Sequence, residues 1–165
     1  MNPALLVIDV QKAFFEESPT TAQSLRDAMV YINAAIALFR ERELPVISVQ
    51  HLEEEEELVP GQEGFDLPGE LAILPSDPHI HKTYGNAFNQ TGLADELRDL
   101  GVDTVIVTGY CAEFCVLSTY RGAEDLDLTA IVLRGALASD NLSRVKFVEE
   151  ISNVISYGAL KKVLG

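Results

Sequence analysis

The chain has 165 residues, of which 47% are hydrophobic and 23% charged, a balance typical of a globular domain. Its 26 acidic and 12 basic residues give a formal net charge of −14, which argues against nucleic acids and anionic membrane surfaces as partners. No apolar stretch approaches the roughly 18 residues of a membrane span, and neither a signal peptide nor a disulfide scaffold is indicated. We therefore expect one domain over residues 1–165, soluble and cytoplasmic, with reduced thiols.

The first half of the chain alternates apolar segments with a helical pattern. Continuous apolar residues at 4–9 ("ALLVID") and 45–50 ("PVISVQ") predict strands that are buried on both faces. Between them, apolar residues recur at helical spacing from 22 to 39 and predict one long helix. A short strand is expected at 79–82 ("HIHK").

The segment 51–78 is expected to be a long loop. It holds four of the seven prolines, three glycines and the acidic run from Glu53 to Glu57. A loop of this length within a compact domain is usually functional or mobile. The glutamates indicate either a solvated, self-repelling surface or a lid or oligomer contact.

The second half of the chain continues the same alternation. A helix is predicted over 93–100, ending at Gly101, and strands are predicted at 104–109 and 129–134. Apolar residues at 148, 151 and 155 predict a last helix that ends near residue 158. The succession predicts an α/β fold of three layers, α/β/α, with a mainly parallel, Rossmann-like sheet.

Reactive side chains follow several of these strands, at the edge where open α/β sheets bind ligands. Cys115 stands near the start of a helix, and Lys82 ends the short strand; both features are expected to lower the thiol pKa from its usual value of about 8.5. Asp9 could then act as general base, and backbone N–H groups at the helix start could form an oxyanion hole. The set suits acyl transfer.

Each of these residues also has a structural alternative. Cys115 could be a small buried apolar residue, Asp9 could cap a turn, and Lys82 could be solvated. The catalytic hypothesis therefore requires that all three side chains meet.

Three segments resemble, in order, those of the isochorismatase-like family of cysteine hydrolases, which includes nicotinamidases and N-carbamoyl amide hydrolases. They are "LLVIDVQKAF", "HKTYGNAFNQTGLADEL" and "VIVTGYCAEFCVLSTYRGAED", and the resemblance spans about residues 4 to 157. It implies an Asp9, Lys82 and Cys115 triad and a thioester-type intermediate on Cys115. It also implies a cis peptide bond between Tyr110 and Cys111, with the N–H groups of Cys111 and Cys115 in the oxyanion hole.

The sequence departs from this family in two places. Nicotinamidases carry an Asp-x-His metal motif after the second strand, whereas "SVQHLEEEEE" keeps His51 and lacks the aspartate. His79 and His81 share one face of a strand without an evident third ligand, so we expect no metal and no cofactor. Gly135 stands where the family usually has aspartate. With the triad intact, we expect cleavage of an amide, ureido or carbamoyl C–N bond rather than the vinyl ether of isochorismate.

The resemblance suggests a small-molecule substrate and a homodimer or homotetramer. Residues that flank the triad in sequence are candidates for substrate binding, although two of the phenylalanines could equally pack in the core. The candidates are Gln11, Phe14, His51, Tyr84, Phe88 and Tyr110.

Two other functions stay open. The protein could be a catalytically silent family member that binds a metabolite or a protein partner. It could also be a thiol redox sensor that uses Cys111 and Cys115, but helical spacing would hold their Cβ atoms about 6 Å apart, whereas a disulfide needs about 3.8 Å.

Overall fold

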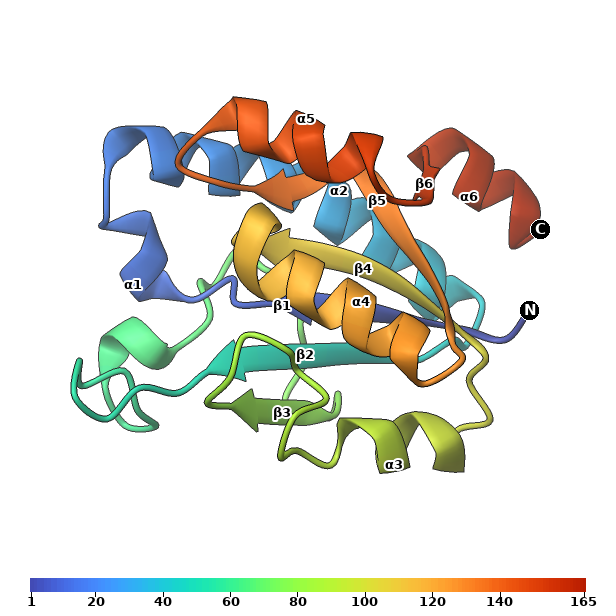
Figure 1. Ribbon diagram of the computed structural model, residues 1–165, viewed down its shortest axis with the longest axis horizontal. Coiled ribbons are helices and arrows are strands. Elements are labelled where there is room, and N and C mark those ends of the chain that lie inside the picture. Colours follow the sequence, from blue (N-terminus) through green and yellow to red (C-terminus); the bar gives the residue numbers. More distant parts are fainter.

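A computed structural model describes residues 1–165, and its centre is a six-stranded parallel sheet in the order β3-β2-β1-β4-β5-β6 (Figure 1). The strands are β1 (Pro3–Ile8), β2 (Val46–His51), β3 (His79–Lys82), β4 (Thr104–Tyr110), β5 (Thr129–Ala138) and β6 (Val154–Ile155). The helices are α1 (Lys12–Phe15), α2 (Pro19–Glu41), α3 (Leu93–Asp99), α4 (Leu117–Asp125), α5 (Leu142–Glu150) and α6 (Tyr157–Val163). A 3-10 turn, η1 (Glu63–Phe65), and a π-helical turn, η2 (Ala112–Val116), complete the chain.

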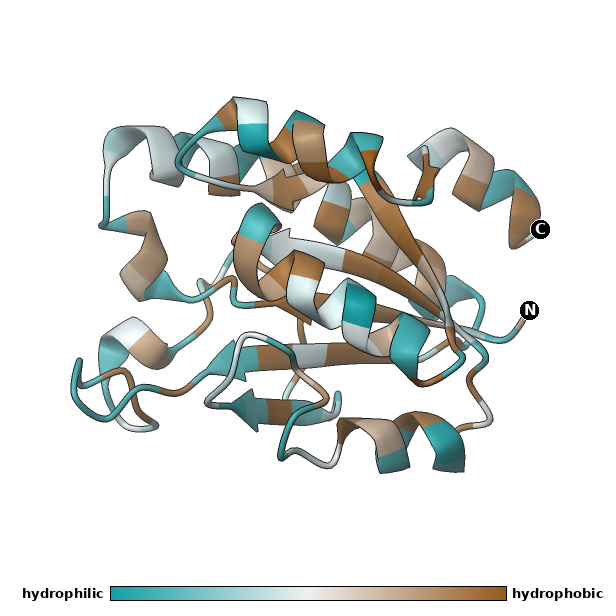
Figure 2. Ribbon diagram, in the orientation of Figure 1, coloured by the Kyte–Doolittle hydropathy of each residue, from teal (hydrophilic) through white to brown (hydrophobic).

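Side chains alternate between the two faces of the sheet, and each face has its own core. Leu5 and Val7 of β1 pack in the cluster that contains the buried face of α2 and Leu160 of α6. Leu6 and Ile8 pack in the opposite cluster, with residues from α3, α4 and α5. Brown, hydrophobic colour runs along the central strands, whereas the surrounding helices are mixed (Figure 2). The three-layer α/β/α prediction is therefore confirmed.

Helix α2 is the long helix that the apolar spacing predicts. Its start is fixed by Ser18, whose hydroxyl oxygen accepts a hydrogen bond from the N–H of Thr21 at 3.0 Å, and by Pro19 in the first turn. Leu25, Ile32 and other apolar residues on one face are buried against the sheet. No helix of the protein is both long enough and apolar enough to cross a membrane.

The helix predicted from Val148, Ile151 and Ile155 is confirmed only in its first part, and its predicted end near residue 158 is wrong. Helix α5 ends at Glu150, and Val154 and Ile155 form β6, which pairs with the middle of β5. Asn153 lies at the break, and its N–H donates to the hydroxyl of Tyr120 at 2.9 Å. Gly158 lies inside α6, which begins after the cap Ser156. Two β-branched residues at an open sheet edge thus outweigh the helical spacing.

Strand β5 is longer than predicted because it contains a bulge. Its pairing with β4 shifts register, so that Val107 faces Val132 but Gly109 faces Leu137. Gly135 lies in the bulge with a φ of +84°, a backbone conformation that favours glycine. The bulge brings the strand to Ala138, so the chain enters α5 at the carboxyl edge of the sheet.

Candidate active site

Asp9, Lys82 and Cys115 meet at the carboxyl edge of the sheet. Asp9 follows β1 directly, Lys82 is the last residue of β3, and Cys115 lies in η2, which follows β4. The Lys82 Nζ atom is 3.0 Å from Asp9 Oδ2 and 3.3 Å from Cys115 Sγ. Lys82 is 1% exposed, so it is not the solvated lysine of the structural alternative. The Asp9 carboxylate pairs with Lys82 through Oδ2, and its Oδ1 accepts no hydrogen bond, so it does not cap a turn.

His51, at the end of β2, completes the surroundings of the lysine. Its Nδ1 atom lies 2.8 Å from Lys82 Nζ. Burial, and then the charge of Lys82, lower the pKa of His51, so the imidazole is neutral and Nδ1 can accept a hydrogen bond from the Lys82 ammonium. The three protons of the ammonium thus face a carboxylate, an imidazole and a thiol.

The same geometry decides how a metal ion would fit. The ligand atoms of Asp9, His51 and Cys115 lie within 4.8 Å of one another, a spacing that could hold a cation. Each of those groups is in contact with Lys82 Nζ, so an ammonium already stands among them. A divalent ion would have to displace this buried positive charge, and the arrangement therefore does not fit a metal.

The electrostatics of Cys115 differ from the sequence-based expectation of a lowered pKa. Burial, and then the Asp9 carboxylate, raise the pKa of the thiol to about 11, and Lys82 opposes the shift only in part. Lys82 compensates only in part because it is shared with Asp9, so a thiolate would be a second anion beside one ammonium. Burial also raises the pKa of Asp9, against the pull of Lys82, so this carboxylate is a stronger base than usual. Cys115 is therefore a neutral thiol next to a base.

Cys111 lies immediately before η2 and is a different kind of cysteine. Its peptide bond with Tyr110 is cis, as the resemblance implies. Its carbonyl oxygen accepts hydrogen bonds from the N–H groups of Phe114 and Val116, both at 3.1 Å. Burial, and then Glu113, raise the pKa of its thiol to about 12. Both cysteines are free, and the backbone of Cys111, rather than its sulfur, shapes the turn that carries Cys115.

A cavity of about 330 Å³ opens above the triad. Its wall includes six of the residues selected from the sequence, among them Phe14 and Tyr110, whose rings are tilted by 38° with 4.9 Å between their centroids. The lining residues are Asp9, Phe14, Glu17, His51, Glu56, Tyr110, Cys111, Glu113, Phe114, Cys115, Asp140 and Arg144.

Three of the predicted substrate contacts lie outside this cavity. Gln11 is fully buried and joins β2 to the loop after β1: its Nε2 donates to the His51 carbonyl at 3.0 Å, and its Oε1 accepts from the His51 N–H at 2.7 Å. Phe88 packs against the core cluster of the α3 face. Tyr84 is 45% exposed and does not line the cavity. Proximity in sequence to Lys82 did not indicate which of its neighbours face the site.

Six residues that line the cavity were not predicted from the sequence. Asp140 follows β5 and could have been found by the strand-end rule, if the bulge had been anticipated. Glu113 and Phe114 lie inside the nucleophile segment. Glu56 belongs to the acidic run from Glu53 to Glu57, for which the sequence left a solvated surface, a lid or an oligomer contact open. No sequence pattern marks Glu17 and Arg144, which come from a loop and a helix far apart in sequence.

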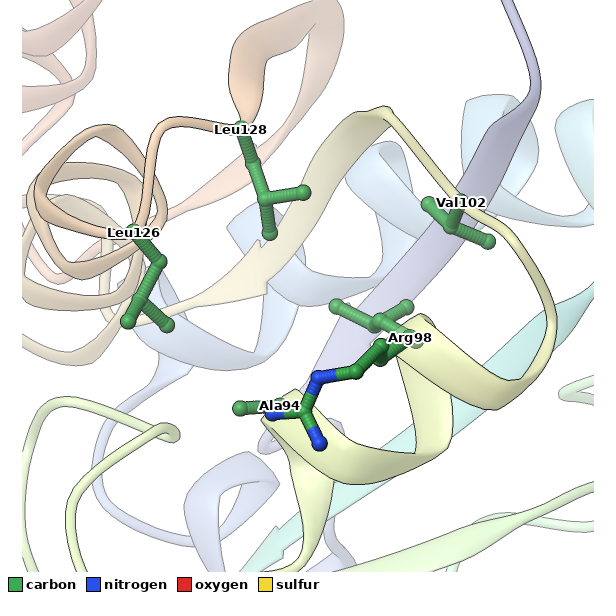
Figure 3. Close-up of a pocket in the computed structure, with 6 residues that line it drawn as sticks. Ala94, Arg98, Val102, Leu126 and Leu128 are labelled. Carbon is green, nitrogen blue, oxygen red and sulfur yellow. The ribbon is translucent and has the colours of Figure 1, made fainter.

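A second hollow, of about 190 Å³, lacks comparable chemistry. It lies near the amino ends of β4 and β5 and is lined by Ala94, Leu97, Arg98, Val102, Leu126 and Leu128 (Figure 3). Its single charged group, Arg98, forms an ion pair with Asp95 at 2.8 Å.

The two histidines of β3 each contact another group. His79 Nε2 is 3.1 Å from the Leu74 carbonyl oxygen, and the His81 ring meets the Phe65 ring edge-on with 5.0 Å between the ring centroids.

The strand order brings a buried acid, a lysine and a thiol together at the carboxyl edge of a parallel α/β sheet. The isochorismatase domain model matches residues 3–151, and the chain belongs to the isochorismatase family of hydrolases.

Individual relatives agree with this assignment. The isochorismatase family protein YddQ of Bacillus subtilis is 28% identical over 145 residues, covering 86% of this chain and 81% of the relative. Ureidoacrylate amidohydrolase RutB of Caulobacter vibrioides is 33% identical over 79 residues, which are 48% of this chain and 35% of that enzyme. A crystal structure of an isochorismatase family protein superposes with a TM-score of 0.84 and 34% identity, covering 94% of this chain and 97% of the other.

Proposed function

We propose that the protein hydrolyses a C–N bond in a small amide, ureido or carbamoyl compound through a covalent intermediate on Cys115. The observation that carries the proposal is the buried Lys82, which contacts both the Asp9 carboxylate and the Cys115 sulfur. The similarity to a ureidoacrylate amidohydrolase supports the bond class.

The first half of the reaction forms the intermediate. As Cys115 Sγ attacks the substrate carbonyl carbon, Asp9 takes the thiol proton, because burial makes it basic and the thiol does not ionise alone at neutral pH. The N–H groups of Cys111 and Cys115 are proposed to bind the oxyanion. Asp9 then returns the proton to the nitrogen, the C–N bond breaks, and ammonia or an amine leaves.

The second half releases the acid. Asp9 removes a proton from water, the water oxygen attacks the thioester or thiocarbamate carbon, and the C–S bond breaks. The thiol regains its proton from Asp9. Throughout, Lys82 stays hydrogen-bonded to Asp9 and lies beside the sulfur, where it stabilises negative charge as it moves between the two.

The test is turnover of a panel of primary amides, N-carbamoyl amines and ureido compounds, followed by release of ammonia or amine. Cys115→Ser, Asp9→Asn and Lys82→Met should each lower kcat/KM by at least about a thousandfold, because triad members act as a unit. Glu41→Gln, an exposed change at the opposite end of the sheet, is the control. A panel that the wild type does not hydrolyse would instead favour a silent, ligand-binding member of the family.

We further propose that the protein is a cytoplasmic homodimer or homotetramer. Its two cysteines are free, as expected for a reducing compartment. The oligomeric state is proposed from resemblance to the family.

A further inference from the structure

The cavity above Cys115 is strongly acidic. Its wall carries five carboxylates and one guanidinium, and the buried Lys82 adds one positive charge beneath it. The carboxylates are Asp9, Glu17, Glu56, Glu113 and Asp140, and the guanidinium is Arg144. Asp9 and Lys82 offset each other, so the field in the cavity is set by the remaining side chains.

Arg144 neutralises only part of this charge. It lies 3.2 Å from a Glu113 oxygen and 3.3 Å from an Asp140 oxygen, so one cation is shared by two acids. Glu17 and Glu56 have no basic group within ion-pair distance. Glu17 accepts only a neutral hydrogen bond, from the Tyr110 hydroxyl at 2.5 Å.

Two carboxylate oxygens in the cavity wall are buried without a hydrogen-bond partner. They are Oδ1 of Asp9, whose side chain is 2% exposed, and Oε2 of Glu113, whose side chain is 13% exposed. A buried acceptor that is left unpaired is unfavourable, so both oxygens are suited to a donor that a ligand supplies. The Asp9 oxygen is used by the reaction, which leaves the Glu113 oxygen for binding.

The rest of the wall also suits a cation. Phe14 and Tyr110 form a tilted aromatic pair in the cavity wall, and Phe114 is 62% exposed at the cavity. Aromatic faces attract ammonium and guanidinium groups through their negative quadrupole. The one basic residue of the wall, Arg144, is already paired with two acids, so no free cation is available to bind a substrate carboxylate.

We propose that the substrate is cationic: an amide, ureido or carbamoyl compound that also bears an ammonium or guanidinium group. This inference rests on the proposed function and adds the substrate class. Glu17 and Glu56 are its specificity residues, because they are the unpaired acids at the mouth. Substrates that carry a carboxylate in this position are disfavoured.

The pKa shifts of two neighbouring groups agree with an excess of negative charge in the cavity. Besides burial, Glu17 raises the pKa of Tyr110, and Glu113 raises that of Cys111. Both groups resist gaining a negative charge, as expected in a field that already favours cations.

The first test reads the charge preference of the site without turnover. Cys115 is modified with three methanethiosulfonates that carry trimethylammonioethyl, hydroxyethyl or sulfonatoethyl groups, and each rate is measured by peptide mass spectrometry and divided by that of 2-mercaptoethanol. We expect the cationic reagent to exceed the anionic one by at least about tenfold at low salt, and the ratio to shrink in ~0.5 M NaCl. The thiol pKa cancels in this ratio.

Matched variants assign the preference to residues. Glu17→Gln combined with Glu56→Gln should reduce the ratio at least about threefold, whereas Glu41→Gln should leave it unchanged. A wild-type ratio near one, or a preference for the anionic reagent, would overturn the inference. So would a double variant that keeps the full ratio.

The second test uses substrates of matched size with a cationic, neutral or anionic tail. The inference predicts the highest kcat/KM for the cationic member, and a loss of that preference in the double variant. Turnover with equal or greater preference for the anionic member would overturn the substrate class and leave the hydrolase proposal intact. Absence of all turnover, beside a high reagent ratio, would overturn the hydrolase proposal and leave a binding site for cations.

Discussion

Lys82 contacts the other two triad residues, Asp9 and Cys115, and also His51. Its Nζ atom is within 3.3 Å of Cys115 Sγ and closer still to Asp9 and His51, and its own side chain is buried. A lysine at the end of an edge strand has no sequence pattern that marks it as buried. The resemblance of the surrounding segment, rather than its hydropathy, identified it.

The raised pKa of Cys115 predicts how the labelling of this cysteine depends on pH. Because burial and Asp9 raise it to about 11, iodoacetamide labelling of Cys115 should rise with pH throughout the range from 7 to 10, in step with the thiolate fraction. Asp9→Asn removes the nearby anion and should move the labelling curve to lower pH. Lys82→Met removes the nearby cation and should move it to higher pH.

Labelling is read by peptide mass spectrometry, which separates Cys115 from Cys111. A wild-type curve with its midpoint near or below 8.5, the usual range of a free thiol, would contradict the account of a neutral thiol activated by Asp9. A curve unmoved by Asp9→Asn would contradict the pairing of the two residues.

The elements that hold the site are β1 and β4, which run side by side and end in Asp9 and the cysteine segment. Gly109 of β4 faces Ile8 of β1 with a φ of +116°, and a Cβ atom there would lie 2.0 Å from the Ile8 carbonyl oxygen. No shift of a side chain could relieve this contact, because the neighbour is backbone. The close approach fixes the distance between Asp9 and η2.

Gly109→Ala should therefore separate the two strands beside the site. We expect the free energy of unfolding to fall by more than about 2 kcal/mol and turnover to be lost. Chemical denaturation measures the first effect. Gly158→Ala is the control, since a Cβ there meets no atom within 4 Å, and it should change stability by no more than about 1 kcal/mol. Equal stability of the two variants would refute the role of Gly109.

Elements with a strong periodic pattern could be predicted from the sequence, and those set by tertiary contacts could not. The buried strands and α2 have continuous or helical apolar spacing over many residues. Strand β6 has two residues and exists because the edge of β5 is available to pair with it. The bulge in β5 depends on Gly135 and on the ring of Tyr31 beside it, which is distant in sequence.

The residues of the candidate site also fall into two groups, those that could be predicted from the sequence and those that could not. The triad residues follow strands, and their segments resemble a known family in order, so they could be predicted. The acids at the cavity mouth, Glu17 and Glu56, come from the loop after α1 and the segment after β2, and only the folded chain brings them together. Tyr84 was predicted as a substrate contact because it is near Lys82 in sequence, but its side chain is exposed outside the cavity.

The whole molecule carries a formal charge of −14, which has the same sign as the charge of the cavity. A negative surface around a negative cleft raises the local concentration of cations and the rate at which they arrive. The same charge opposes contact between copies of the chain, since like surfaces repel until salt screens them.

This repulsion gives a prediction for the proposed homodimer or homotetramer. Sedimentation velocity should show an oligomer whose dissociation constant decreases as NaCl rises from about 0.05 to about 0.5 M, because screening weakens the repulsion. A monomer at all protein concentrations and at both salt concentrations would contradict the proposed assembly. The charge preference of the cavity is measured separately and does not depend on this result.

The role of Cys115 as nucleophile is tested most directly by the mass of its peptide, taken from enzyme that is quenched with acid during turnover of a hydrolysed panel substrate. We expect an acyl or carbamoyl adduct on Cys115, none on Cys111, and neither adduct nor turnover in Cys115→Ala. Turnover that persists in Cys115→Ala would contradict the claim that this cysteine is the nucleophile.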